Sequence, residues 1–161
     1  VNRNISKIKL NALEEMEILD ELVKKYREGL PPLPELCPEH VKSLYEHLKK
    51  YLYDDCRMME VRLELGLHNK NIIWQFDRWV GQKPKAFQLH HHMILAERLL
   101  RETPCSILSI ANALGYPCQD NLGKNFKRKY KMSPSEYRQQ VWAGPEENGT
   151  FFEPNVEWFF V

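Results

Sequence analysis

Apolar side chains recur every three or four residues along much of this chain, which is the spacing of helices with one buried face. This pattern predicts helices over residues 5 to 30, 40 to 53 and 84 to 101. A proline-rich stretch, residues 29 to 38, ends the first of them, because proline lacks the amide donor and restricts the residue before it. The chain is therefore expected to be all-α.

The segment from residue 5 to 30 allows two interpretations. Its apolar or aromatic positions are Ile5, Ile8, Ala12, Met16, Leu19, Val23, Tyr26 and Leu30. From Ala12 onward the steps alternate strictly between four and three, as in a coiled coil. The helix either lies on its own domain or forms the seam of a homodimer through residues 5–30.

Residues 65 to 87 and 114 to 137 are two versions of one pattern about fifty residues apart. The matching pairs are Leu65 and Leu114, Gly66 and Gly115, Phe76 and Phe126, Pro84 and Pro134, and Phe87 and Tyr137. Self-similarity of this length indicates a repeated supersecondary unit. A glycine closes a helix with positive φ at little steric cost. Each copy therefore predicts a helix, a tight turn and a second helix.

Charge is unevenly distributed in a chain of net charge +1. Residues 61 to 145 carry 13 Lys and Arg against 6 Asp and Glu, which is +7, whereas residues 1 to 60 carry 10 against 12 and residues 146 to 161 carry 0 against 4. A basic block suits a polyanionic partner, although a solvated helix face has the same composition.

The sequence does not support a metal-binding, membrane or secreted protein. The cysteines Cys37, Cys56, Cys105 and Cys118 are scattered and lack zinc-ligand spacing, so we expect reduced structural thiols, no metal site and no cofactor. Residues 90 to 92 are all histidine, but helical spacing turns them about 100° apart, and we expect them on the exposed surface. No apolar run is long enough for a membrane span, and the N-terminus lacks a signal-peptide core.

Catalysis is equally unsupported, so we expect no enzyme and no catalytic residues. Ser106 and Ser109 lack the context of a nucleophile elbow, and the chain has no glycine-rich phosphate loop. Its carboxylates fall on predicted solvated helix faces.

The second repeat closely resembles the signature of the AraC/XylS family of bacterial transcription regulators. The resemblance rests on residues 110–116 (IANALGY), Gln119, residues 126–132 (FKRKYKM) and residues 133–138 (SPSEYR), together with residues 96–100 (AERLL). It extends over residues 42 to 138 and leaves out residues 1 to 38 and the C-terminal tail. It implies a seven-helix DNA-binding domain in which a long helix holds two helix-turn-helix units.

Three regions are therefore expected along the chain. Residues 1–38 form an N-terminal amphipathic helix and linker, and residues 39–142 form the DNA-binding domain. Within that domain the first helix-turn-helix covers about 56–81, the linker helix about 84–101 and the second helix-turn-helix about 106–131. Residues 143–161 are an acidic, aromatic tail that we expect to pack on the domain or on a partner chain.

The second unit is expected to place a recognition helix over about residues 119 to 129. Glutamine and asparagine can pair with adenine, aspartate can accept from cytosine, and lysine can donate to guanine or phosphate. The basic end of the helix suits phosphate neutralisation. The expected DNA-binding residues are Gln119, Asp120, Asn121, Gly123, Lys124, Lys127, Arg128 and Lys129. Leu122 and Phe126 are expected in the core, and Lys131 stands where the family usually has glycine.

The first unit departs from the family pattern in its recognition helix, expected over about residues 69 to 79. Trp74 stands where a basic residue is common, Ile73 where a small polar one is, and Asp77 where lysine is usual. This helix could contact thymine methyls or another protein. Its expected contact residues are Asn69, Lys70, Asn71, Ile73, Trp74 and Arg78.

These observations predict sequence-specific binding of double-stranded DNA by a transcription regulator in the bacterial cytoplasm, with RNA polymerase as a conceivable further partner and no membrane association. The alternative is a protein-interaction module on a degenerate helix-turn-helix scaffold. Because the chain begins with Val1 and residues 1–38 are too short for a ligand-binding barrel, we expect any sensor upstream of this segment or in another chain.

Overall fold

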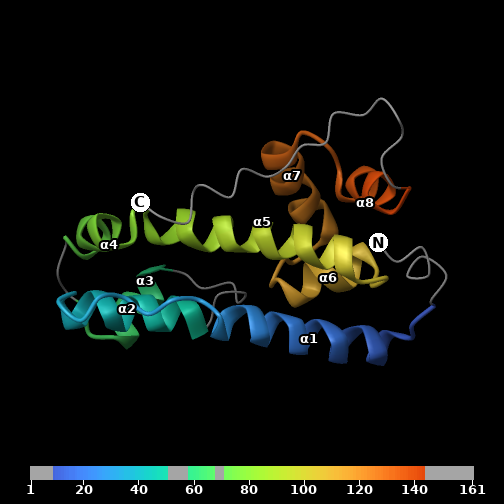
Figure 1. Cartoon of the computed structure of the whole chain (residues 1–161). Helices are drawn as coiled ribbons and strands as arrows, with labels where there is room; N and C mark the ends of the chain where they lie inside the picture. Colours follow the sequence, from blue (N-terminus) through green and yellow to red (C-terminus); the bar gives the residue numbers. More distant parts are fainter. Residues whose placement is uncertain (1–8, 51–57, 68–70, 144–161) are drawn as a thin grey trace.

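The computed structural model describes residues 9–50, 58–67 and 71–143 (Figure 1). Within these ranges the fold is helical and contains no strand, which confirms the all-α prediction. The helices are α1 (Ala12–Glu28), α2 (Glu39–Lys50), α3 (Met58–Glu64), α4 (Ile72–Val80), α5 (Pro84–Glu102), α6 (Ile107–Ala113), α7 (Gln119–Tyr130) and α8 (Pro134–Ala143). The expectations for the aromatic tail, for Cys56 and for residues 1–8 fall outside the described residues.

Helix α5 is the central element, and α4, α6, α7 and α8 pack against it (Figure 1). Pro84 occupies its first turn, where a missing amide donor costs nothing. Along the rest of the helix the buried side chains point in several directions and not along one stripe. These residues are Phe87, His91, Met93, Leu95, Ala96, Glu97, Leu99 and Leu100. The apolar residues among them join one hydrophobic cluster that extends into both helix-turn-helix units.

The two repeats fold alike down to their turns. Gly66 and Gly115 adopt positive φ values of 62° and 73°. In each turn the amide of the following residue closes the helix, with Leu67 donating to the carbonyl of Arg62 at 2.8 Å and Tyr116 to that of Ala111 at 2.9 Å. Such bonds satisfy carbonyls at a helix end. The predicted helix-turn-helix pairs are therefore α3 with α4, and α6 with α7.

The recognition helices also end in the same way. Gly81 follows α4 with φ 81°, and Lys131 follows α7 with φ 63°. Each donates its amide to the carbonyl four residues earlier, at 2.8 and 2.9 Å. Among the described non-glycine residues, Lys131 is the one with positive φ. A lysine there is strained by its Cβ, whereas the matching glycine in the first unit is not.

Helix α1 lies on its own domain and contacts α5 and α6. Leu19 is 1% exposed, while Val23 and Tyr26 are half-buried against the core. The face that suggested a dimer seam is thus largely used within the chain. The helix begins at Ala12 and not at residue 5, because Asn11 caps it: its side chain accepts from the amides of Leu13 and Glu14 at 3.0 and 2.9 Å.

The expectation that residues 90–92 lie on the exposed surface is wrong for His91, which is 4% exposed. Its Nδ1 shares a hydrogen bond of 2.8 Å with the hydroxyl of Tyr26, and its ring packs on Phe87. Burial, with smaller effects from His90, His92 and Lys129, lowers the pKa of His91 to about 3, so the ring is neutral. Helix α1 packs over α5 and buries this histidine. The local spacing of residues does not encode that contact.

The N-terminal half of α1 is held at the start of α6 by Glu15. Its carboxylate accepts from the Ser106 amide at 3.0 Å, from the Ser106 hydroxyl at 3.2 Å and from the Ser109 hydroxyl. Burial alone would raise the pKa of Glu15, but these hydrogen bonds and the charge of Arg138 lower it below its usual value. The charged carboxylate is therefore the form that docks α1.

Glu15→Gln is expected to lower the free energy of unfolding by about 1 kcal/mol near pH 7, at the low end for hydrogen bonds to a charged group because this carboxylate is partly solvated. Since its pKa is lowered on folding, the contribution is present above the unfolded pKa and disappears as the pH falls through the folded pKa. Urea unfolding at pH 7 and pH 3 measures this. The control is Glu17→Gln on the same helix, and equal losses in both variants, or a loss independent of pH, would contradict the assignment.

Lys131→Gly is expected to raise the free energy of unfolding by about 0.5 to 1 kcal/mol, because glycine adopts positive φ without strain, less its larger entropy in the unfolded chain. Thermal or urea unfolding provides the measurement. Lys131→Ala is the matched control, since it removes the same charge but keeps the Cβ. Stabilisation of both variants alike would show that charge, and not backbone strain, matters at this position.

Candidate nucleic-acid interface

The recognition helix of the second unit, α7, is anchored by one face. Leu122 and Phe126 are fully buried, and Tyr130 donates its hydroxyl to the Met93 carbonyl on α5 at 3.1 Å. The helix begins at Gln119 and ends at Tyr130, close to the predicted limits. Because α7 is fixed to α5 on this side, its opposite side is free to present side chains to a partner.

The outward side of α7 carries the predicted contact residues. At about 100° per residue, Lys124 points directly away from Leu122 and Phe126, and Asp120 and Lys127 project beside it. All three are exposed, as are Asn121 and Arg128 beside them. Three of these five side chains are cationic, and none of the three enters a salt bridge that the described residues form among themselves. This side can therefore offer donors and positive charge to a polyanion.

Lys129 is placed differently from its neighbours. It follows Leu122 by seven residues and Phe126 by three, so it leaves the helix near the buried side, with its side chain still exposed. Its Nζ lies 5.5 Å from the centre of the Tyr130 ring. Burial lowers its pKa, which the nearby carboxylate of Glu97 partly offsets. Among the predicted contact residues of α7, it is the least suited to reach DNA.

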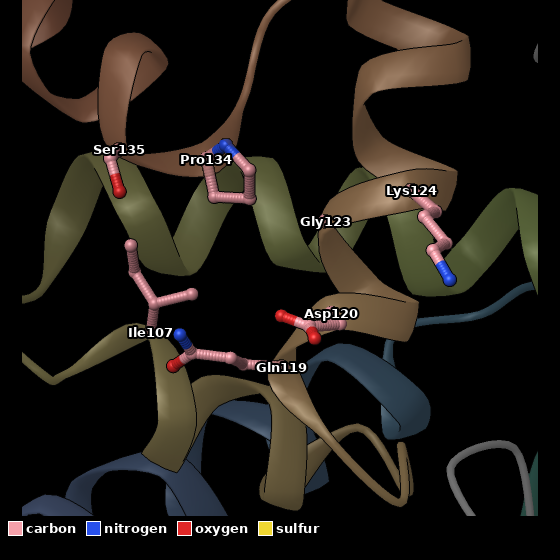
Figure 2. Close-up of a pocket in the computed structure, with 7 residues that line it drawn as sticks. All are labelled: Ile107, Gln119, Asp120, Gly123, Lys124, Pro134 and Ser135. Atoms are coloured by element: carbon pink, nitrogen blue, oxygen red, sulfur yellow. The ribbon is translucent and has the colours of Figure 1, made fainter.

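A hollow of about 270 Å³ lies on one flank of α7. Figure 2 shows it between the start of α6, the first turns of α7 and the start of α8. Its lining residues are Ile107, Gln119, Asp120, Gly123, Lys124, Pro134 and Ser135. The sequence pattern indicated the four on α7 but not the other three. The repeated proline marked the start of α8, but nothing in the sequence indicated that it meets α7.

The first recognition helix, α4, begins at Ile72, three residues later than predicted. Asn71 precedes it with φ −90° and ψ 0°, and its side chain does not cap the helix. Ile72 and Phe76 are fully buried, as their counterparts in α7 are. The predicted contacts Asn69 and Lys70 lie outside the described residues.

The exposed surface of α4 is aromatic. Trp74 is 61% exposed, and the guanidinium of Arg78 lies 5.5 Å from the centre of its ring. The arrangement gives a flat apolar platform with one cation, a cation–π pair. Ile73 is half-buried and packs against the core. Trp74 and Arg78 are therefore the side chains of α4 best placed to contact a partner, together with exposed Asn71.

A side chain that the sequence did not indicate helps to seat α4. Gln75 is half-buried, and its Oε1 forms a hydrogen bond with Nε2 of His40 on α2. The bond links the recognition helix to the helix that opens the domain. Gln75 thus faces inward despite its position between two predicted contact residues.

Neither a metal site nor a membrane-spanning helix is found among the residues that the structure describes. No three of their His, Cys, Asp or Glu side chains converge in a way that could hold a metal ion. Likewise, none of their helices combines the length and apolar character needed to cross a bilayer.

Comparison with known proteins agrees with this geometry. Residues 63–140 match a family model described as a helix-turn-helix domain. The chain is similar to the transcriptional regulator MtrA of Neisseria gonorrhoeae, with 38% identity over 75 residues, which are 47% of this chain and 25% of the relative. It therefore spans only about a quarter of that regulator.

Two solved structures share the fold. The C-terminal domain of AraT, a response regulator from Geobacillus stearothermophilus, matches 75% of this chain and 98% of its own length, with a TM-score of 0.60 and 20% identity. The DNA-binding domain of AdpA, solved with a target DNA, matches 63% of this chain and 92% of its own length, with a TM-score of 0.57 and 18% identity.

The fold and the site define a double helix-turn-helix domain of the class found in transcription regulators. Residues 63–140 match the model of a helix-turn-helix domain, and part of the chain is similar to transcription regulators. The resemblance noted in the sequence is confirmed by these matches.

Proposed function

We propose that this protein binds specific sequences of double-stranded DNA as a transcription regulator, with α4 and α7 in successive major grooves. The observation that carries the proposal is the exposed outward side of α7. Asp120, Lys124 and Lys127 project from a helix whose other side is anchored in the core. An α-helix about 10–12 Å wide fits a major groove about 12 Å wide, where base edges distinguish all four base pairs.

The rigid connection between the units supports binding by both helices. Successive major grooves on one face of B-DNA are about 34 Å apart, so two recognition helices must be held at a fixed separation. Helix α5 shares its buried side chains with both units. Such a shared core resists changes in the spacing of α4 and α7.

Charge supports the same partner. Residues 61–145 carry seven more Lys and Arg than Asp and Glu, 13 against 6. Cationic side chains at the end of α7 suit phosphates, which position a protein on DNA, while Asp120 and Lys124 can reach base edges. The AdpA domain, which shares the fold, was solved with a target DNA. Such a role places the protein in the bacterial cytoplasm, where RNA polymerase is a natural further partner.

A second candidate function is supported by α4 alone. The Trp74–Arg78 platform lacks the several cations that α7 presents, and Asp77 stands where α7 has Lys127. Exposed tryptophan and arginine are also typical of protein interfaces. In this alternative, α7 reads DNA weakly or not at all, and the first unit binds another protein.

Selection of binding sites from a pool of random duplexes at low salt tests the proposal. The wild-type protein should enrich one sequence. Lys124→Ala should weaken binding to it by about 1 to 3 kcal/mol and relax one base position, as loss of a base contact does. Trp74→Ala should relax a thymine-containing position in the other half of the site, or leave DNA binding intact and abolish a protein contact.

No enriched sequence for the wild type would favour the protein-interaction alternative. Specificity lost in Trp74→Ala and kept in Lys124→Ala would show that the two halves are assigned the wrong way round.

Lys127→Ala and Arg128→Ala should each make the slope of log K against log salt shallower by about 0.9, because each removes one phosphate contact. The loss of affinity should be similar for all duplexes. Titration at several salt concentrations measures the slope. Lys129→Ala is the control, since that side chain leaves α7 near its buried side, and an equal change of slope in it would contradict this placement.

A further inference from the structure

Gly123 lies in the interior of α7, where the fold does not require a glycine. Its φ is not in the positive region, and a Cβ added there would meet no atom within 4 Å. A glycine inside a helix is destabilising by about 0.5 to 1 kcal/mol relative to alanine. The first repeat shows that a side chain is compatible with this position, because the matching residue is Ile73. The glycine therefore lowers the free energy of unfolding, although no contact or backbone conformation within this chain requires it.

The empty space at Gly123 lies on the flank of the recognition helix and not on its outward side. Asp120 and Lys124 point away from the buried face, whereas Gly123 is turned by about 100° toward the starts of α6 and α8. There it belongs to the hollow of about 270 Å³ that Ile107, Pro134 and Ser135 complete (Figure 2). When a helix lies in the major groove, its outward side meets base edges and its flanks meet the sugar–phosphate strands.

We propose that this hollow, the Gly123 hollow, receives one sugar–phosphate unit of the DNA backbone, and that glycine at position 123 sets how closely the strand approaches α7. This inference rests on the proposed function. The apolar side chains of Ile107 and Pro134 suit the deoxyribose, and the Ser135 hydroxyl can donate to the phosphate, whereas Lys124 extends along the other side of α7 (Figure 2). Figure 2 shows the Asp120 carboxylate turned toward the hollow, so its negative charge keeps the phosphate at the Ser135 side.

The experiment compares Gly123→Ala with the wild-type protein in unfolding and in DNA binding. The variant should melt about 2 to 4 °C higher, because alanine favours the helix and meets no neighbour. It should bind every duplex at least about fivefold more weakly, since the added methyl group overpacks the contact with the strand. The base preferences found by site selection should stay unchanged, because a backbone contact carries no sequence information.

Gly29→Ala is the matched control. Gly29 ends α1 with φ −77°, a value that alanine adopts readily, and an added Cβ would make ordinary contacts at 3.4 Å. That substitution should raise the melting temperature similarly and leave DNA affinity unchanged. Gly123→Leu, which extends further into the hollow, should weaken binding more than Gly123→Ala does.

Three results would overturn the inference. If Gly123→Ala melts lower than the wild type, the glycine is structural. If the variant binds DNA as tightly as the wild type, no strand enters the hollow. If its loss is confined to duplexes that differ at one base pair, the hollow receives a base edge. Failure of the proposed function is distinct, because the wild-type protein itself would then select no sequence.

Discussion

The structure depends on the burial of α5 along nearly its whole length. Polar groups buried on such a helix must find partners, because an unpaired one costs more than its hydrogen bond returns. Glu97 does so by accepting the hydroxyl of Tyr137 and pairing with Arg101 at 3.2 Å, and His91 does so through Tyr26. These bonds attach α8 and α1 to the central helix. The same contacts that remove water from α5 therefore fix the surrounding helices, so the two helix-turn-helix units share one core.

Helix α1 extends this arrangement beyond the part of the chain that matches the family model. Figure 1 shows it on the side of α5 away from α7 and α8. It contacts α6 through Glu15 and the middle of α5 through Tyr26, and Arg27 donates to the Lys50 carbonyl at the end of α2 at 2.8 Å. One helix thus joins the second unit, the helix between the units and α2. It adds rigidity without covering the outward side of α7.

The two units use one backbone for different surfaces. Both recognition helices bury an aliphatic residue and a phenylalanine four positions apart, which seats them alike. The residues between these buried positions differ in size and charge: α7 has Gly123 and Lys124 where α4 has Ile73 and Trp74. A helix with an open flank and several cations suits the grooves and strands of DNA, whereas an aromatic platform suits a methyl group or an apolar surface. Substitution at exposed positions is tolerated because the seating residues lie on the other side.

The sequence by itself determined the helices, the two turns and the side of α7 that faces solvent, because each depends on spacing of three or four residues and on glycine at positive φ. Gly66, Gly115, Leu122 and Phe126 were predictable for that reason. Local pattern could not decide what meets across the core. It left the partner of α1 open, placed His91 on the surface, and did not indicate that α6 and α8 enclose the flank of Gly123. Those features arise from residues distant in the chain, so only packing around α5 decided them.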